Sequence, residues 1–281
     1  MATSAAAGVG ARGRRARVVL TVVGAVLVAL VVAMGVVSCF WTPYDPTAMA
    51  PAARFSGPSA SHLLGTDQYG RDTLSRIMAA ARPALAVGVG SVVLGAAVGV
   101  AMGSVAAAVR GLRAVVMRLT DGMMAFPGIL LAMMLIMVMG RGLAGTFVAV
   151  AAFMVPTFTR LSCTLVMEAI GRPYVRAAMS YGTSRARAVV VHVMPNVMPR
   201  IVTQLSSSVG TAILLEASLS FLGLGIQPPQ PSWGVMVSEA VTYVFTYPGQ
   251  IVAPGLALVL SVLGFNLLGD GLNDRLVERG A

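Results

Sequence analysis

The sequence predicts an all-α, polytopic membrane protein with six transmembrane helices. Hydrophobic residues make up 57% of the 281 positions, charged residues make up only 11%, and the mean hydropathy is +0.84. Soluble domains carry about 25% charged residues, so this composition is typical of a chain that lies largely in lipid. Several uncharged apolar stretches also reach the length of about 20 residues that a helix needs to cross a bilayer.

The order of the apolar stretches divides the chain into three parts. A basic leader occupies 1–17, a first helix with an outer loop occupies 18–82, and a core of five helices occupies 83–281. The fifth helix begins before its uncharged stretch and runs through Glu216, and a turn at Tyr247-Pro248-Gly249 precedes the sixth. The six predicted spans are residues 18–40, 83–109, 119–139, 144–166, 197–222 and 250–269.

The distribution of arginine predicts the orientation. There is no lysine, and fifteen of the twenty arginines fall in the leader, in the loops after the second and fourth spans or at the span ends beside them (Arg160 and Arg200), and at the C-terminus. Cytoplasmic segments of membrane proteins carry such an excess of positive charge. We therefore expect both termini in the cytoplasm, together with the loop at 168–195.

The first apolar stretch has a competing interpretation. Arg14-Arg15 precedes it, and Val36-Val37-Ser38-Cys39 resembles the cleavage site of a lipoprotein signal. The apolar core of a cleaved signal has about 7–15 residues, whereas this stretch is longer and five further spans follow it. We therefore predict that the segment is retained as a membrane helix.

Charge and cysteine content exclude other classes of protein. The net charge of +10 is not accompanied by a nucleic-acid-binding motif. We therefore attribute the positive charge to the cytoplasmic loops of a membrane protein and not to binding of RNA or DNA. Cys39 and Cys163 lie far apart without the spacing of metal ligands, which excludes a disulfide scaffold. His62 and His192 lie on opposite sides of the membrane and cannot form a paired catalytic site, and His62 is expected to be solvated.

The second span contains Gly95, Gly99 and Gly103, which are four residues apart. Glycines at this spacing line one face of a helix and allow a second backbone to approach closely. Packing within the chain is favoured over an interface with another subunit.

Two acidic residues, Asp121 and Glu216, lie at membrane depth and are candidates for the translocation path or for an interface. Asp121 is at the inner end of the third span, and Glu216 is surrounded by serine and threonine in the fifth. Ionisable residues inside a membrane are functional candidates by default. They are assigned either to a proton relay or to pairing with an arginine or a backbone group.

The basic loop at 174–195 predicts a helix, an elbow and a second helix. Pro173 suits the first position of a helix, and Gly182 suits the left-handed conformation that ends one. Thr183 or Ser184 is expected to cap the second helix. Pro195 is expected to break that helix before the fifth span.

The same loop resembles the cytoplasmic loop of membrane subunits of binding-protein-dependent ABC importers. That family's pattern is Glu-Ala-Ala, three residues, glycine, nine residues, then Ile/His-x-Leu-Pro. The loop here matches this spacing with Arg176-Ala177-Ala178, Gly182 and His192-Val193-Met194-Pro195. Arg176 replaces the glutamate of the family, and Met194 replaces the leucine.

Further segments resemble the second permease of dipeptide, oligopeptide and nickel importers, and together they cover about residues 40–276. They are Leu64-Gly65-Thr66-Asp67-Gln68-Tyr69-Gly70-Arg71-Asp72, Leu219-Ser220-Phe221-Leu222-Gly223-Leu224-Gly225, Gln227-Pro228-Pro229, Trp233-Gly234 and Phe265-Asn266-Leu267-Leu268-Gly269-Asp270-Gly271-Leu272.

The resemblance implies a type I ABC importer permease in the inner membrane of a bacterium. It implies a heterodimer with a homologous permease, two cytoplasmic ATPase domains that bind ATP and Mg²⁺, and an extracytoplasmic solute-binding protein. It assigns Arg176, Ala177, Ala178, Gly182, His192 and Pro195 to contact with the ATPase.

The chain itself is expected to be non-catalytic and without a cofactor. It has no lysine, so it cannot form the Gly-x4-Gly-Lys-Ser/Thr phosphate loop. Dipeptides or oligopeptides are the expected cargo, with nickel, glutathione or a haem-like solute as alternatives. A stand-alone proton-coupled carrier that uses Asp121 or Glu216 is the alternative mechanism.

Overall fold

A computed structural model describes the backbone of residues 2–280 and the side chains of 18–109 and 111–273. Within these residues the chain is helical and contains no strand beyond one isolated bridge between Thr66 and Asp72, so the all-α prediction is confirmed. The elements are α1 (Ala2–Phe40), a 3-10 turn (Pro51–Ala53), α2 (Thr73–Ala108), α3 (Arg110–Ala125), α4 (Gly128–Met139), α5 (Leu143–Ile170), α6 (Pro173–Ser180), α7 (Arg185–Ala188), a π-helical turn (Val189–Val193), α8 (Met194–Phe221), α9 (Trp233–Val241) and α10 (Gly249–Gly280).

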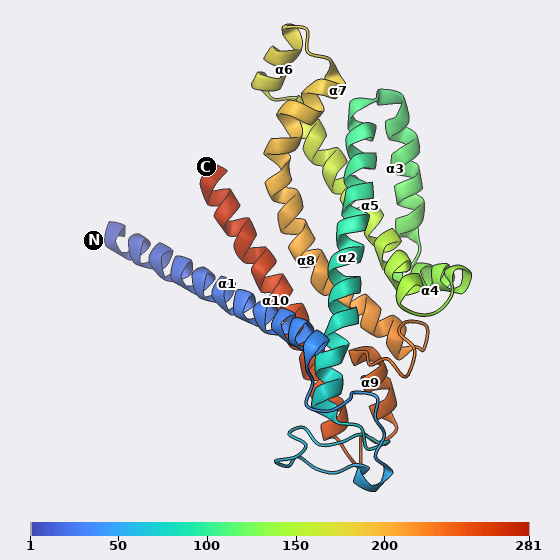
Figure 1. Cartoon of the computed structure of the whole chain (residues 1–281). Coiled ribbons are helices and arrows are strands. Elements are labelled where there is room, and N and C mark those ends of the chain that lie inside the picture. The colour runs from blue at the N-terminus through green and yellow to red at the C-terminus, as the bar shows by residue number, and fades with distance from the viewer. Residues whose placement is uncertain (1, 281) are drawn as a thin grey trace.

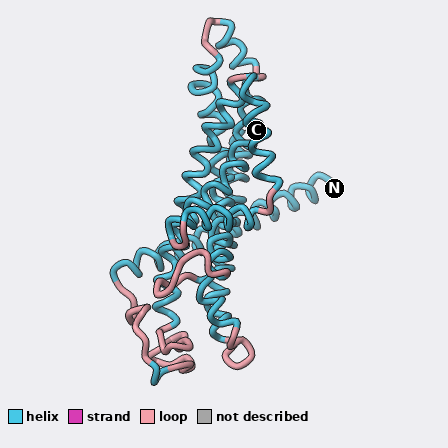
Figure 2. Tube along the Cα trace, turned by 90° about the vertical axis from the view of Figure 1, so that its right-hand side faces the viewer, coloured by secondary structure: helices cyan, strands magenta, loops and turns pink. Residues whose placement is uncertain are grey.

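The helices form an elongated bundle with two distinct ends (Figure 1). The elbow end carries α6 and α7. The loop end carries the segments 41–72 and 222–249, where most of the irregular backbone gathers (Figure 2). Helices α1 and α10 pack against each other and lean away from the rest of the bundle.

The centre of the bundle is the contact between α2 and α5, the most extensive helix pair in the fold. Gly95 lies against the carbonyl of Ala151, and a Cβ on Gly99 would come within 2.6 Å of the carbonyl oxygen of Val155. Gly103 faces the next turn of α5. The glycine stripe therefore packs inside the chain, as predicted, because only a missing side chain lets the two backbones approach so closely.

Four helices are long and apolar enough to cross a membrane among the described residues: Val18–Phe40, Thr73–Ala108, Leu143–Ile170 and Gly249–Asn273. The pair α3 and α4 is a fifth candidate if it counts as one span. Helix α8 has 28 residues, and at 1.5 Å per residue it is about 42 Å long. It is less apolar than the others, because serine, threonine, Arg200 and Glu216 interrupt it. The count of six spans stays a prediction.

The predicted third span is not one straight helix. Helices α3 and α4 meet at an angle of 96° around Phe126-Pro127. Proline disfavours helical geometry in the residue before it, and Phe126 accordingly adopts an extended conformation with φ −86° and ψ 138°. The apolar composition of 119–139 could not reveal this bend.

The second span also begins earlier than predicted. Helix α2 starts at Thr73, where the side chain of Asp72 accepts a hydrogen bond from the Ser75 backbone N–H at 2.8 Å. The prediction placed the start at residue 83 because Arg76 and Arg82 interrupt the uncharged stretch. The division between 18–82 and 83–281 therefore falls inside a helix, and the side chains of the predicted leader 1–17 lie outside the described residues.

Substitution of Gly99 by leucine is expected to lower the free energy of unfolding by about 1–3 kcal/mol, the range for overpacked cores. The new side chain meets the backbone of Val155 and Thr159, which cannot rotate away. Thermal unfolding of the purified protein in detergent measures the change. Gly255→Leu in α10 is the matched control, because nothing lies within 4 Å of a Cβ at Gly255. Equal stability of the two variants would contradict the packing described.

Candidate functional site

The elbow end has the predicted local structure. Pro173 occupies the first turn of α6, and Gly182 has a φ of +91°, a left-handed value that glycine adopts without strain. The hydroxyl of Ser184 caps α7 and accepts a hydrogen bond from the Arg187 backbone N–H at 3.4 Å. The prediction of helix, glycine elbow and helix is confirmed by this geometry.

Pro195 does not break the second helix, so that prediction was wrong. The backbone is helical without interruption from Arg185 to Phe221, and Pro195 lies in the first turn of α8. A π-helical turn at Val189–Val193 directly precedes it. Such a wide turn changes the hydrogen-bond register, which provides a place for a residue that has no N–H to donate. The elbow is therefore continuous with α8.

Two polar contacts and one buried apolar side chain attach the elbow to the bundle. The guanidinium of Arg185 donates to the carbonyl of Ala107 at 2.9 Å, at the end of α2. The amide of Asn196 donates to the Tyr174 hydroxyl at 3.0 Å, which joins α8 to α6. Val175 of α6 is buried in the hydrophobic core. These contacts join α6 to α8 and α7 to α2, so the elbow is attached to two long helices.

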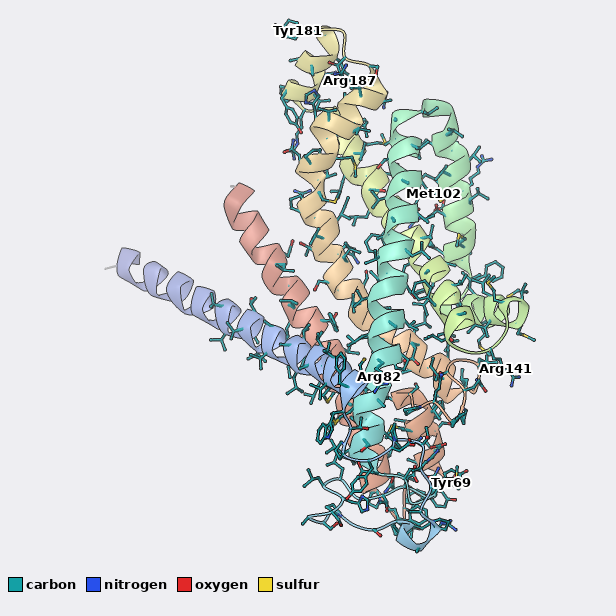
Figure 3. All side chains as sticks on the ribbon, in the orientation of Figure 1. Tyr69, Arg82, Met102, Arg141, Tyr181 and Arg187 are labelled. Atoms are coloured by element: carbon teal, nitrogen blue, oxygen red, sulfur yellow. The ribbon has the colours of Figure 1, made fainter. Side chains whose placement is uncertain are left out.

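The outer face of the elbow is exposed. Tyr181 is 92% exposed, and it projects with Arg187 at the end of the molecule opposite to Tyr69 (Figure 3). Arg176 and Ala177 are exposed beside it, whereas Ala178 is half-buried. Among the described side chains, no acidic group pairs with Arg176. We call the exposed residues Tyr174, Arg176, Ala177, Tyr181 and Arg187 the elbow face.

His192 and Pro195 lie away from the tip of the elbow. His192 is half-buried, and its backbone carbonyl accepts a hydrogen bond from the Asn196 amide at 2.8 Å. Pro195 is exposed at the start of α8. Of the six residues assigned to the loop by resemblance, the structure thus brings Arg176, Ala177, Ala178 and Gly182 together and sets these two apart in the supporting helix.

The two acidic candidates occupy different environments and do not form one site. Asp121 on α3 pairs with Arg160 on α5 at 2.6 Å, and both side chains are about half exposed. Glu216 on α8 is fully buried. Its Oε1 accepts hydrogen bonds from the hydroxyls of Ser220 at 2.8 Å and Ser232 at 3.0 Å. Glu216 therefore ties the segment before α9 to the end of α8.

A buried cluster of four charges at the loop end was not predicted. Arg71 donates to Asp67 at 2.6 Å and to Glu239 at 2.8 Å, and Arg76 donates to the same Glu239 oxygen at 3.0 Å. Both arginines are at least 97% buried. The cluster joins the 41–72 segment and α2 to α9, and we call it the loop-end charge cluster. Buried charges persist only when they are paired in this way.

The same end contains two further contacts between distant segments. The indole N–H of Trp233 donates to the carbonyl of Ile77 at 3.1 Å. His62, expected to be solvated, is half-buried instead, with its Nδ1 2.9 Å from the carboxylate of Asp72 and its ring 4.7 Å from that of Tyr44. That expectation was wrong, because it considered the position of His62 in a loop and not the carboxylate that caps α2.

Sequence spacing gave only a partial signal for the loop-end cluster. Asp67 and Arg71 are four residues apart, but Glu239 is 168 residues away from Arg71 along the chain.

Comparison with known proteins identifies the class to which this bundle belongs. Residues 95–279 match the family described as binding-protein-dependent transport system inner membrane component. The chain belongs to this family, and the match covers the glycine stripe, the elbow and the loop-end helix α9.

The chain is also similar to individual permeases of glutathione and di/tripeptide transport systems. The chain is 41% identical over 260 residues to a glutathione transport system permease protein of Pectobacterium atrosepticum, covering 90% of this chain and 86% of the relative. It is 38% identical over 260 residues to a di/tripeptide transport system permease protein of Pseudomonas aeruginosa, with the same coverage. A glutathione permease of Escherichia coli is 40% identical over 269 residues, covering 94% and 88% of the two chains.

Substitution of Glu239 by glutamine is expected to destabilise the protein by about 3 kcal/mol. Loss of the shared carboxylate leaves the buried Arg71 and Arg76 with one anionic partner, and breaking a buried pair costs about 3–5 kcal/mol. The lower end applies because the Glu239 side chain is 20% exposed. Thermal unfolding in detergent measures the loss.

Asp121→Asn is the matched control for this substitution. It also removes one carboxylate from an ion pair, but this pair is exposed, so the expected loss is below about 1 kcal/mol. A Glu239→Gln variant as stable as Asp121→Asn would show that the loop-end charge cluster does not hold α9 in place.

Proposed function

We propose that this chain is one of the two membrane subunits of an ATP-driven importer of short peptides. Family membership supports the role of a permease, and the elbow supports the coupling to a motor. The observation that carries the proposal is the elbow face, an exposed surface at one end of the bundle that is rigidly connected to α2 and α8.

The elbow is proposed to bind a cytoplasmic ATPase subunit. A short helix with an exposed tyrosine and arginines offers both apolar contact and positive charge to a cleft in the partner. When ATP closes the ATPase dimer, α6 moves with the cleft. The displacement passes to α8 without a hinge at Pro195, because the helix is continuous, and to α2 through the Arg185 contact with Ala107.

The remaining assembly follows from the same proposal. A homologous permease completes the translocation path, two ATPase subunits bind ATP and Mg²⁺ at the elbow ends, and a solute-binding protein delivers cargo to the loop ends. The loop end then faces outward, with both termini in the cytoplasm of a bacterium, as the arginine distribution indicates. Asp121 and Glu216 are structural in this scheme: one closes an ion pair between α3 and α5, and the other holds the segment before α9.

Short peptides are the proposed cargo. The relatives are named for di- and tripeptides and for glutathione, which is itself a tripeptide. The assembled complex, reconstituted in nanodiscs with its binding protein, is expected to hydrolyse ATP faster when dipeptides, tripeptides or glutathione are added. If nickel stimulates ATP hydrolysis and none of the peptides does, the proposed cargo is wrong but the assignment as a permease subunit stands. Solute uptake by this chain alone without ATP would overturn the proposal in favour of a proton-coupled carrier.

Substitution of Gly182 by valine is expected to reduce peptide-stimulated ATP hydrolysis to the unstimulated rate. A β-branched residue at φ +91° is strained by about 1–2 kcal/mol, so the elbow changes its angle and α6 no longer fits its cleft. Membrane insertion is expected to be unchanged because nothing lies within 4 Å of the new Cβ.

Gly171→Val is the matched control for the elbow, because Gly171 has an ordinary helical φ of −71°. This variant is expected to keep normal stimulation. If Gly182→Val also shows normal peptide-stimulated ATP hydrolysis, the elbow does not couple the ATPase to the membrane helices.

The exposed positive charge of Arg176 leads us to expect a charge-dependent contact with the ATPase. Because it is exposed and has no acidic partner among the described side chains, an acidic group of the ATPase is expected to face it. Arg176→Glu is expected to weaken association of the ATPase about tenfold at low salt, and less at high salt because the interaction is screened. Binding of the purified ATPase to the permease pair measures this. Arg113→Glu on α3 is the control, and an equal loss in both variants would contradict a specific contact.

A further inference from the structure

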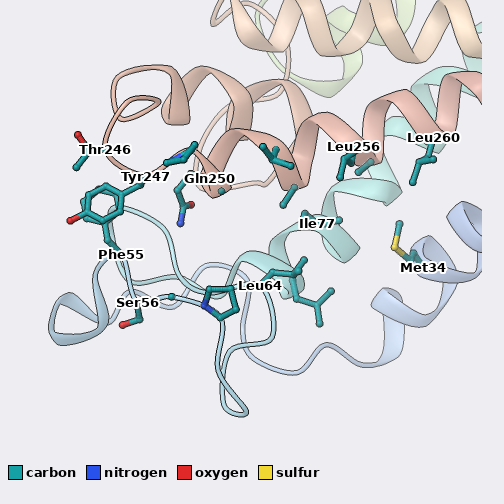
Figure 4. A pocket seen from close by; sticks show the side chains of 18 of the residues that line it. Met34, Phe55, Ser56, Leu64, Ile77, Thr246, Tyr247, Gln250, Leu256 and Leu260 are labelled. Atoms are coloured by element: carbon teal, nitrogen blue, oxygen red, sulfur yellow. The ribbon is translucent and has the colours of Figure 1, made fainter.

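A groove between α1 and α10 has no role in the transport scheme. It encloses about 620 Å³ at the loop end of the two helices and also touches the start of α2 (Figure 4). Its floor contains the buried Val31 and Ile77, and its mouth contains Leu30 and Leu256, which are each about half exposed. We propose that this groove binds one acyl chain of a membrane phospholipid.

The depth of the groove matches one leaflet of a bilayer. Helix α1 ends at Phe40 and is followed by Trp41. Their side chains are 87% and 61% exposed, and exposed aromatic residues of this kind mark the membrane interface. Leu30 is ten residues before Phe40, which at 1.5 Å per residue is about 15 Å deeper. This distance is about half of the hydrocarbon core of 30 Å. The groove therefore extends from the interface to near the bilayer centre.

The groove is polar at one end only, as a lipid is. Ser56, Thr246, Tyr247 and Gln250 line the end near the loops, whereas the deeper end is lined by aliphatic side chains and Met34 (Figure 4). Hydroxyls at the rim can meet the glycerol esters of a lipid whose tail points inward. Arg54 is exposed beside this end, with its guanidinium carbon 5.6 Å from the ring centroid of the lining residue Phe55, and can offer a positive charge to the phosphate group.

The rim is held in a fixed shape. Phe55 has a φ of +52°, which is uncommon for a residue with a side chain. Its ring stacks on Tyr247 at 4.1 Å with an interplanar angle of 1°, and Gln250 donates to the Thr66 carbonyl at 2.6 Å. Backbone strain that neighbouring contacts maintain is found at ligand sites. The rim is thus built before any ligand binds.

Hydrocarbon is the occupant that fits the location and the size. The groove opens among exposed apolar residues of two membrane helices, a surface that lipid tails cover. Its aliphatic walls offer no partners to water. An unbranched acyl chain in the groove makes dispersion contacts with the wall atoms, which these atoms lack when the groove is empty.

A photoreactive phospholipid tests this inference. The assembled complex in nanodiscs is given a trace of phosphatidylethanolamine with a diazirine at the end of one acyl chain, illuminated and mapped by peptide mass spectrometry. Labelling is expected to concentrate on Leu30, Ile77 and Leu256. Val26 and Val259, which are 60% exposed on the same helices but outside the groove, serve as reference positions.

Filling the groove is expected to displace the lipid. Ala257→Trp places a large side chain among the lining residues and is expected to lower labelling of Leu30 about tenfold, a change equivalent to about 1.4 kcal/mol. Val259→Trp on the outer face of α10 is expected to leave it unchanged. If Ala257→Trp does not assemble, the labelling pattern of the unaltered complex decides.

Two outcomes would overturn the inference. Even labelling of Val26 and Leu30 would show that lipid only surrounds the helices. A photoreactive amino acid at Leu256 that cross-links to the second permease would show that the groove holds polypeptide. Neither result depends on which solute the complex transports, so the acyl-chain site and the proposed function fail separately.

Discussion

The close contact between α2 and α5 is the interaction on which the other features depend. Lipid surrounds both helices, so association gains little from the hydrophobic effect and relies on packing. The glycines of α2 make this packing dense, because a Cβ at Gly99 would collide with the α5 backbone. Helix α2 is thereby held in place along the length of the bundle, from the loop end to the elbow end.

Both ends of α2 carry polar structures that this support holds in place. At its first turns, Arg76 enters the loop-end charge cluster and fixes α9, while the carbonyl of Ile77 receives the Trp233 indole. At its last turn, the carbonyl of Ala107 receives Arg185 from the elbow. One helix therefore connects the surface proposed to meet an ATPase with the surface proposed to meet a solute-binding protein. A rigid connection of this kind is what conversion of ATPase closure into helix displacement requires.

The acyl-chain groove lies outside this axis. It is formed where α1 and α10 lean away from the bundle, and its floor includes Ile77, the residue whose carbonyl binds Trp233. A lipid in this groove would therefore lie against the same turn of α2 that holds α9. Lipid composition would then act on the stability of the loop end and not on the elbow.

Local features of the fold were predictable from the sequence because they depend on neighbouring residues. Apolar length predicted most of the membrane helices, and glycine spacing predicted close packing of the second span within the chain. Pro173, Gly182 and Ser184 predicted the elbow. Each signal acts within a few residues: a missing N–H, a left-handed φ, a capping hydroxyl. Where two local signals competed, the prediction failed. Pro195 predicted the end of a helix, but the π-helical turn at Val189–Val193 lets the helix continue through it. The apolar composition of 119–139 predicted one straight span, whereas the helix bends at Phe126-Pro127.

The charge pairings and the groove were decided only by the tertiary structure. Arg71 and Glu239 meet because the fold places the segment 41–72 beside α9, and no local sequence pattern around either residue predicts this pairing. Glu216 was recognisable as an unusual charge in an apolar helix, but its serine partner on the next segment became known only from the fold. Helical periodicity and turn chemistry are local, so the sequence determines them by itself. A buried charge takes its role from whichever distant group the folded chain brings within hydrogen-bonding distance.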